Sequence, residues 1–173
     1  RIFGWETDAH GSEYKSFLHQ FLAAITAYLM ESGDWDNCVF HVSDEPNEAS
    51  VDNYKDGAAL IRKYVPAEKI IDALSNLDYY IDGLLKRPVA ATDHAEAFIA
   101  AKVPDLWVYY CCGQGNKVSN RFLAMPGRRT RVIASQLFKY DIAGFLQWGY
   151  NFWNSHLSIR PLDPWRDTDG DSV

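Results

Sequence analysis

The sequence has little cysteine, no excess of positive charge and no long apolar run. Its three cysteines, two of them adjacent (Cys111 and Cys112), are too few for a disulfide framework. A net charge of −6 argues against binding to nucleic acid or to an anionic membrane surface. No stretch reaches the roughly 18 apolar residues of a membrane span. We therefore expect neither nucleic acid nor a membrane among the partners.

Aromatic residues, in contrast, are abundant. They make up 14% of the 173 residues. The whole chain is 47% hydrophobic, aromatics included, and 23% charged, as in ordinary globular proteins. The simplest explanation is a large core. The alternative is a carbohydrate site, because aromatic faces cover the apolar C–H faces of sugar rings.

Short apolar runs alternate with helical patterns along the chain. Strands are predicted at residues 38–42, 69–74, 88–93, 106–111 and 145–150. Helices are predicted at residues 13–32, 50–64, 76–86, 95–103 and 119–140, the last interrupted near Pro126. This alternation favours an α/β protein with a parallel sheet buried on both faces. No glycine-rich loop follows the first strand, so a (β/α)₈ TIM-type barrel is favoured over a dinucleotide-binding sheet.

Polar or aromatic residues stand at the carboxyl ends of most predicted strands, where barrel enzymes carry their active sites. These residues are Asp44 and Glu45, Asp93 and His94, Tyr110, and Tyr150 with Asn151.

Asp44 and Glu45 are the strongest candidates for chemistry. Glu45 precedes Pro46, so we expect extended backbone there, with the two side chains pointing to different sides. Both carboxyl groups can then reach one substrate. Two carboxyl groups this close do not both ionise easily, and a general acid must keep its proton. The alternative is an ordinary charge pair at the start of a loop.

Other candidates are weaker. His41, inside the first strand, is expected to be a core histidine. The adjacent pair Cys111–Cys112 fits neither metal-binding nor redox spacing, so we expect no metal and no cofactor. Residues 147–153 hold four large aromatics together with a glycine and two amides, which suits either a core or a sugar platform.

Four blocks of sequence, residues 41–46, 88–98, 106–126 and 144–155, together resemble the catalytic domain of glycoside hydrolase family 123 and its relatives, many of them classed as a domain of unknown function. The resemblance runs over about residues 13–171. It implies a (β/α)₈ barrel, usually behind an N-terminal β-sandwich, that removes terminal N-acetylgalactosamine from glycans.

The resemblance also implies a mechanism and a set of roles. The enzyme would be a retaining exo-β-N-acetylhexosaminidase in which the substrate's own 2-acetamido group is the nucleophile, an exception to the two-carboxylate scheme. Glu45 would be the acid/base and Asp44 would hold the acetamido group. The expected sugar contacts are Asp93, His94, Tyr109, Tyr110, Trp148, Tyr150 and Asn151.

Two alternatives stay open. One is a conventional retaining glycosidase with a protein nucleophile, for which Asp93 is the candidate. The other is a barrel that binds carbohydrate without cleaving it.

The extent of the chain is a further expectation. In the family, the catalytic pair follows the fourth barrel strand, whereas here it follows the first predicted strand. We therefore expect residues 1–173 to form one incomplete barrel domain, about strands 4 to 8, without the N-terminal strands and any β-sandwich. Such a fragment, produced alone, is expected to be inactive. The compartment is left open between secreted, periplasmic and cytoplasmic.

Overall fold

The computed structural model describes residues 3, 7–115, 117–122, 125–147, 160–163 and 165–166. The chain divides into two compact units. The first comprises residues 1–72 with 78–87, and the second comprises residues 73–77 with 88–173. The sheet strands β1 (Ile71–Leu74) and β2 (Arg87–Ala91) lie where the chain passes from one unit to the other.

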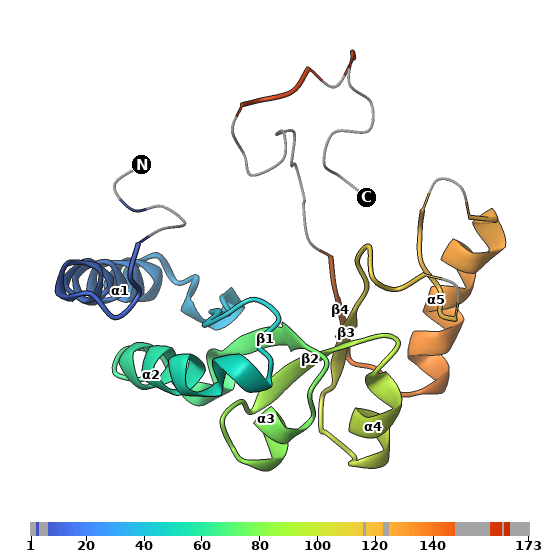
Figure 1. Cartoon of the computed structure of the whole chain (residues 1–173), viewed down its shortest axis with the longest axis horizontal. Helices are drawn as coiled ribbons and strands as arrows, with labels where there is room; N and C mark the ends of the chain where they lie inside the picture. The colour runs from blue at the N-terminus through green and yellow to red at the C-terminus, as the bar shows by residue number, and fades with distance from the viewer. Residues whose placement is uncertain are drawn as a thin grey trace. The chain divides into compact units, whose positions relative to one another are not determined.

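The first unit is largely helical. It contains α1 (Ser12–Ser32), α2 (Val51–Ile61) and α3 (Asp78–Ile81), with 3₁₀ turns at Trp35–Asn37, Glu48–Ser50 and Ala67–Lys69 (Figure 1). The helix predicted over 13–32 is confirmed, and it ends at Gly33, which adopts a φ of 80°. A left-handed residue at this position is the usual helix stop, and glycine adopts it without steric cost.

The sheet consists of β1 (Ile71–Leu74), β2 (Arg87–Ala91), β3 (Trp107–Tyr109) and β4 (Gly144–Leu146), in the order β1-β2-β3-β4. The pairs β2–β3 and β3–β4 are parallel, with Val89 opposite Trp107 and Trp107 opposite Gly144. Strands that follow one another in sequence also lie next to one another in the sheet. This order lacks the reversal that marks a doubly wound sheet. The predicted α/β class with a parallel sheet is confirmed.

Helices α4 (Ala95–Ala100) and α5 (Gly127–Lys139) connect β2, β3 and β4 in the second unit (Figure 1). The core residues Val89, Ala90, Ala91 and Phe98 are fully buried. In β2 every position after Arg87 is buried, which matches the continuous apolar runs that predicted a sheet covered on both faces.

One close contact fixes the register of β3 and β4. A Cβ atom added at Gly144 would lie 2.3 Å from the indole ring of Trp107, its partner in the sheet. Real Cβ atoms do not approach this closely, so only glycine leaves room for the Trp107 ring.

Three predicted elements differ from the structure. The strand predicted at 38–42 is reduced to a single parallel bridge between Phe40 and Ile70. The helix predicted from 119 begins only at Gly127, because Pro126 lacks the N–H that a continuing helix needs. The last strand is Gly144–Leu146, and residues 148–150 of the predicted strand lie outside the described residues.

Candidate active site

The segment that carries Asp44 and Glu45 runs beside β1 in the first unit. Phe40 donates its N–H to Lys69 over 2.7 Å, and Ile71 donates its N–H to Phe40 over 2.9 Å. These two bonds form the Phe40–Ile70 bridge. Beyond Phe40 the backbone leaves the sheet, and both Asp44 and Glu45 are exposed.

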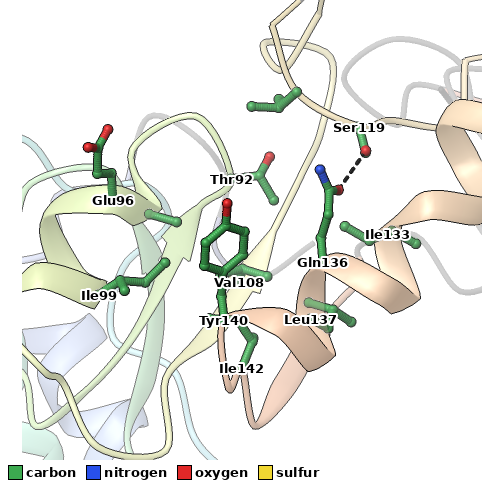
Figure 2. Close-up of a pocket in the computed structure, with 12 residues that line it drawn as sticks. Thr92, Glu96, Ile99, Val108, Ser119, Ile133, Gln136, Leu137, Tyr140 and Ile142 are labelled. Atoms are coloured by element: carbon green, nitrogen blue, oxygen red, sulfur yellow. Dashed lines mark hydrogen bonds between the residues drawn. The ribbon is translucent and has the colours of Figure 1, made fainter.

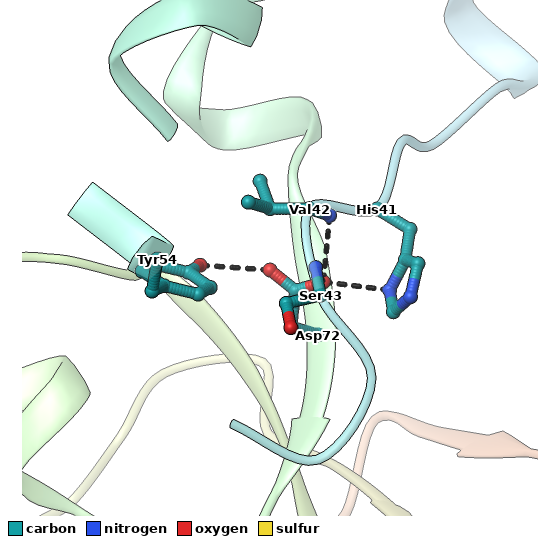
Figure 3. Close-up of polar contacts among 5 residues, drawn as sticks. All are labelled: His41, Val42, Ser43, Tyr54 and Asp72. Atoms are coloured by element: carbon teal, nitrogen blue, oxygen red, sulfur yellow. Dashed lines mark hydrogen bonds and ion pairs between the residues drawn. The ribbon is translucent and has the colours of Figure 1, made fainter. Parts of the chain in front are cut away.

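The side chain of Asp72 explains why the backbone pairing ends there. Its Oδ1 accepts the N–H of Val42 at 2.8 Å and of Ser43 at 3.2 Å (Figure 3). These two donors therefore bond to a carboxylate on β1 and not to β1 backbone carbonyls. The predicted strand is short because a buried side chain replaces the backbone ladder.

Two side chains complete the hydrogen bonding of Asp72. Tyr54, on α2, donates its hydroxyl to Oδ2 over 2.7 Å, and His41 Nδ1 lies 2.6 Å from Oδ1 (Figure 3). The Asp72 side chain is 0% exposed. A carboxylate this buried is strongly unfavourable unless it is hydrogen-bonded, and four donors meet that need.

Tyr54 remains a hydrogen-bond donor. Burial raises the pKa of its hydroxyl well above the usual range, and the charge of Asp72 raises it further. The hydroxyl therefore keeps its proton.

The far end of the segment that carries Asp44 and Glu45, residues 40–47, is held by a second buried tyrosine. Tyr79 is 1% exposed and donates its hydroxyl to the carbonyl of Asn47 over 2.8 Å. Its ring meets that of Tyr54 edge-on, with centroids 5.0 Å apart. Pro46 is also buried. The exposed carboxyl groups of Asp44 and Glu45 thus lie between two anchored points, Asp72 and Tyr79.

The backbone of Glu45 contradicts the extended conformation predicted from Pro46. Its φ is 41°, in the left-handed region that residues with a Cβ rarely adopt. Such strain persists only where surrounding contacts impose it, and it concentrates at functional sites. Here the strained residue lies between the two anchored points, Asp72 and Tyr79.

His41 is not the core histidine that its place in the strand suggested, because 54% of its side chain is exposed. The hydrogen bond with Asp72 raises the pKa of its imidazole, burial lowers it, and the charges of Asp72 and Asp44 raise it again. The net pKa lies above the ordinary value of 6.5. With Val42, Ser43 and Tyr54, His41 lines a groove of about 640 Å³ within the first unit.

Asp93 and His94 follow β2 in the second unit and form a separate polar network. Asp93 Oδ1 lies 3.0 Å from His94 Nδ1 and accepts the Gln114 amide N–H over 3.1 Å. Burial raises the pKa of Asp93, but the hydrogen bonds from His94 and Gln114 outweigh it and the net pKa is lowered. Asp93 is therefore an anion near neutral pH.

Two buried amides organise the loop after β3 around this network. Gln114 accepts the N–H of Cys111 over 2.7 Å. Asn120, 2% exposed, donates to the carbonyls of Cys111 and Gln114, each over 2.7 Å. The loop that follows β3 is therefore held beside Asp93 by side chains that bond to its own backbone.

The other five predicted sugar contacts fall into two groups. Tyr109 and Tyr110 are 6% and 5% exposed, and the Tyr110 ring packs edge-on against Phe145 with centroids 4.8 Å apart. Trp148, Tyr150 and Asn151 lie outside the described residues. The roles of all five as sugar contacts stay predictions.

A cavity of about 420 Å³ lies elsewhere in the second unit, between α4, β3 and α5 (Figure 2). Its lining is mainly apolar, with Ile99, Val108 and Leu137 among the residues, and Glu96 is its one charged side chain. None of the predicted site residues lines it. It is therefore distinct from the site that the sequence predicts.

Five residues that shape the site were not predicted from the sequence: Asp72, Tyr54, Tyr79, Gln114 and Asn120. One signal was available: Asp72 is a charged residue inside an otherwise apolar strand, and a buried charge requires partners. The tyrosines and amides gave no local signal, because their partners are distant in the sequence or belong to loop backbone.

Within the described residues, no group of three or more His, Cys, Asp or Glu side chains is placed to hold a metal ion. No helix in the same part of the chain is long and apolar enough to cross a membrane. The sulfur atoms of Cys111 and Cys112 lie 3.8 Å apart, and neither cysteine is in a disulfide bond.

Two exposed, neighbouring carboxyl groups on one anchored segment fit the glycoside hydrolases, which use carboxyl groups for acid–base chemistry. The chain belongs to glycoside hydrolase family 123, because the family model described as "Glycoside hydrolase 123, catalytic domain" matches residues 2–173. The resemblance seen in the four sequence blocks is thus confirmed.

A solved structure shares the fold. It is a family 123 glycoside hydrolase from Clostridium perfringens, whose structural analysis concerns glycolipid glycan hydrolysis. The match has 18% sequence identity and a TM-score of 0.61, and it covers 91% of this chain but only 30% of that one. The chain therefore spans about a third of the length of this relative. Among curated protein sequences, none matches this chain.

Proposed function

We propose that this chain carries the catalytic pair of a retaining exo-β-N-acetylhexosaminidase that acts on terminal N-acetylgalactosamine or a close relative. Membership of family 123 supports a glycosidase with a glycan substrate. The observation that carries the finer proposal is the strained turn at Glu45. It leaves two neighbouring carboxyl groups exposed on a segment anchored by Asp72 and Tyr79.

In the proposed first step, the acetamido oxygen of the substrate attacks the anomeric carbon. The bond between that carbon and the glycosidic oxygen breaks, and Glu45 gives its proton to the departing oxygen. Asp44 accepts a hydrogen bond from the acetamido N–H, which makes the acetamido oxygen more nucleophilic. The product is a cyclic intermediate and no bond to the protein forms.

In the second step, a water molecule attacks the anomeric carbon and the ring of the intermediate opens. The Glu45 carboxylate takes the proton that the water loses and returns to its starting state. Two displacements at one carbon retain the configuration of the sugar. The protein contributes only acid–base chemistry and orientation, which two adjacent carboxyl groups can supply.

The wider architecture is part of the proposal. The sequential parallel order β1-β2-β3-β4 is the order of consecutive barrel strands. We infer that residues 1–173 are one incomplete (β/α)₈ domain, about strands 4 to 8, and that Asp93, His94, Tyr109, Tyr110, Trp148, Tyr150 and Asn151 contact the sugar.

One observation favours a second candidate, a conventional retaining glycosidase with Asp93 as nucleophile. The lowered pKa of Asp93 keeps it ionised, as a nucleophile must be. That mechanism places the two carboxyl groups about 5–5.5 Å apart. A fluorinated glycoside that traps a stable glycosyl-enzyme would label Asp93 if Asp93 is the nucleophile. It would leave the protein unlabelled if the acetamido group is the nucleophile.

Glu45→Gln in the full-length protein tests the acid role. On a chromogenic β-N-acetylhexosaminide with a poor leaving group, kcat should fall by roughly 10²–10⁴, the usual contribution of general acid catalysis. Glu48→Gln is the matched control, because Glu48 is an exposed glutamate three positions along the same segment. A Glu45→Gln rate within about tenfold of wild type contradicts the proposal.

A further inference from the structure

Cys111 and Cys112 follow β3, and the chain turns as soon as it leaves this strand. The N–H of Gln114 donates to the carbonyl of Cys111 over 3.4 Å, which closes the turn. In an extended strand, adjacent side chains point to opposite faces. Here the turn brings the two sulfur atoms to 3.8 Å from each other. The spacing of the cysteines in the sequence gave no sign of this contact.

Two buried amides hold the backbone of Cys111 in this turn. Gln114 Oε1 accepts the N–H of Cys111 over 2.7 Å, and Asn120 Nδ2 donates to the carbonyl of Cys111 over 2.7 Å. Gln114 and Asn120 are 8% and 2% exposed. Both backbone polar groups of Cys111 are therefore fixed by side chains, and the loop keeps the conformation that brings the two thiols together.

The Gln114 side chain also links the cysteine pair to Asp93. Its Oε1 is bonded to the backbone of Cys111, and its Nε2 donates to Asp93 Oδ1 over 3.1 Å. The two ends belong to one planar amide. If the backbone of Cys111 moves and the amide follows it, the amide nitrogen moves relative to Asp93.

The two thiols differ in access and are poorly spaced for a permanent cross-link. Cys112 is exposed and Cys111 is partly buried, so a dissolved reagent meets Cys112 first. Adjacent Cα atoms lie about 3.8 Å apart across a trans peptide, whereas disulfides usually join Cα atoms about 4.4–6.8 Å apart. A disulfide between neighbours is therefore strained, and strained disulfides are readily reduced. The pair suits a reversible modification.

We propose that Cys111 and Cys112 form a redox-modification site, at which a small disulfide such as glutathione disulfide oxidises the pair to a reversible disulfide that displaces Gln114 from Asp93. The Cys112 thiolate attacks one sulfur of the small disulfide, whose S–S bond breaks, and one thiolate leaves. The Cys111 thiolate then attacks the Cys112 sulfur and the second thiolate leaves. The pair loses two protons and two electrons, and the small disulfide becomes two thiols.

Ring closure reaches Asp93 through the backbone. The sulfur atoms must approach from 3.8 Å to bonding distance, which pulls on the Cys111–Cys112 peptide and on the Gln114 amide bonded to it. Asp93 is a sugar contact in the proposed function and the nucleophile in the alternative, so the oxidised protein should be slower in both. Only this effect on the rate rests on the proposed function.

Peptide mass spectrometry of the full-length protein tests the modification. After treatment with glutathione disulfide and alkylation of the remaining thiols in denaturant, the peptide with Cys111 and Cys112 should carry no alkyl group and be lighter by two hydrogen atoms. Dithiothreitol should restore both thiols. Cys111→Ser should stop at a glutathione adduct on Cys112, because it lacks the second thiol. A wild-type protein that also stops at the adduct, or stays reduced, overturns the proposal.

Kinetics test the effect on Asp93. On a β-N-acetylhexosaminide, kcat of the oxidised wild type should fall about 10-fold or more, since a displacement of about 1 Å at an active site can cost about 10²-fold. Reduction should restore it. Cys112→Ser should match the reduced wild type and ignore the oxidant.

Cys38→Ser is the matched control, because Cys38 belongs to the first unit, and it should respond to the oxidant as wild type does. An unchanged rate in protein that carries the disulfide overturns the link to Asp93. If the reduced wild type hydrolyses no glycoside, the proposed function fails, whereas the mass measurement still decides whether the disulfide forms.

Discussion

Oδ1 of Asp72 is a shared acceptor for His41 Nδ1, at 2.6 Å, and for the backbone N–H of Val42, at 2.8 Å. One buried oxygen therefore ties an imidazole and the main chain before Asp44 to the sheet. Residues 40–47 owe their shape to this contact more than to backbone pairing. Loss of this contact should therefore change the free energy of unfolding and its dependence on pH.

Tyr54→Phe should destabilise the protein by about 1–3 kcal/mol, because it leaves Oδ2 of a buried carboxylate without its hydroxyl donor. Urea unfolding of the full-length protein measures the change. Tyr28→Phe, at a tyrosine that is 62% exposed, is the control and should stay within about 0.5 kcal/mol of wild type. Equal effects from both variants would show that the Tyr54–Asp72 bond does not stabilise the fold.

The contact between His41 and Asp72 should make stability depend on pH in a defined direction. The pKa of His41 is higher in the folded protein than its ordinary 6.5. The stabilisation is therefore complete below about 6.5 and is lost as pH rises through the folded-state pKa. We expect the Tm difference between wild type and His41→Gln to be largest below about pH 6.5 and to shrink as the pH rises through the folded-state pKa of His41. A difference that grows with pH contradicts the contact.

Gly144→Ala should cost about 1–3 kcal/mol or more, because its Cβ would lie 2.3 Å from the Trp107 ring and the strands would have to shift. Gly113→Ala is the matched control, since nothing lies within 4 Å of a Cβ there. Thermal unfolding of the two variants compares them directly. If the Gly144→Ala and Gly113→Ala variants have the same melting temperature, the Trp107 ring does not pack against Gly144.

Residues 1–173 produced alone should aggregate, associate or form a molten state, and should not hydrolyse glycosides. A barrel avoids open sheet edges only by closing, and an unclosed one leaves apolar interior side chains in water at roughly 25 cal/mol per Å². Size-exclusion chromatography, thermal melting and a glycoside assay test this. A monomer with a sharp melt and measurable hydrolysis would refute the incomplete-barrel proposal.

Much of the fold could be predicted because its signals are local. The apolar run around Val89 indicated a strand buried on both faces, and the three- and four-residue spacing around Leu22 indicated α1. Both elements are present. The strand at 38–42 was misjudged for a physical reason. Its apolar residues suit a sheet, but the Asp72 side chain takes the N–H groups of Val42 and Ser43.

The candidate site was only partly predictable. Asp44 and Glu45 were identified because the tripeptide with Pro46 follows an apolar run, whereas the positive φ of Glu45 opposes the usual effect of a following proline. That turn depends on contacts with Asp72 and Tyr79, which are distant in the sequence. His41 was taken for a core residue for the same reason: its partner lies 31 positions away.

The most direct test of the central claim is the rate of the full-length enzyme on aryl β-N-acetylhexosaminides whose acetyl group carries zero, one, two or three fluorine atoms. Fluorine withdraws electrons from the acetamido oxygen and weakens it as a nucleophile, without changing the leaving group. If the acetamido group attacks the anomeric carbon, with Asp44 holding its N–H, kcat/KM should fall steeply with each added fluorine. A kcat/KM that does not change along the series would contradict substrate assistance and would favour a nucleophile supplied by the protein.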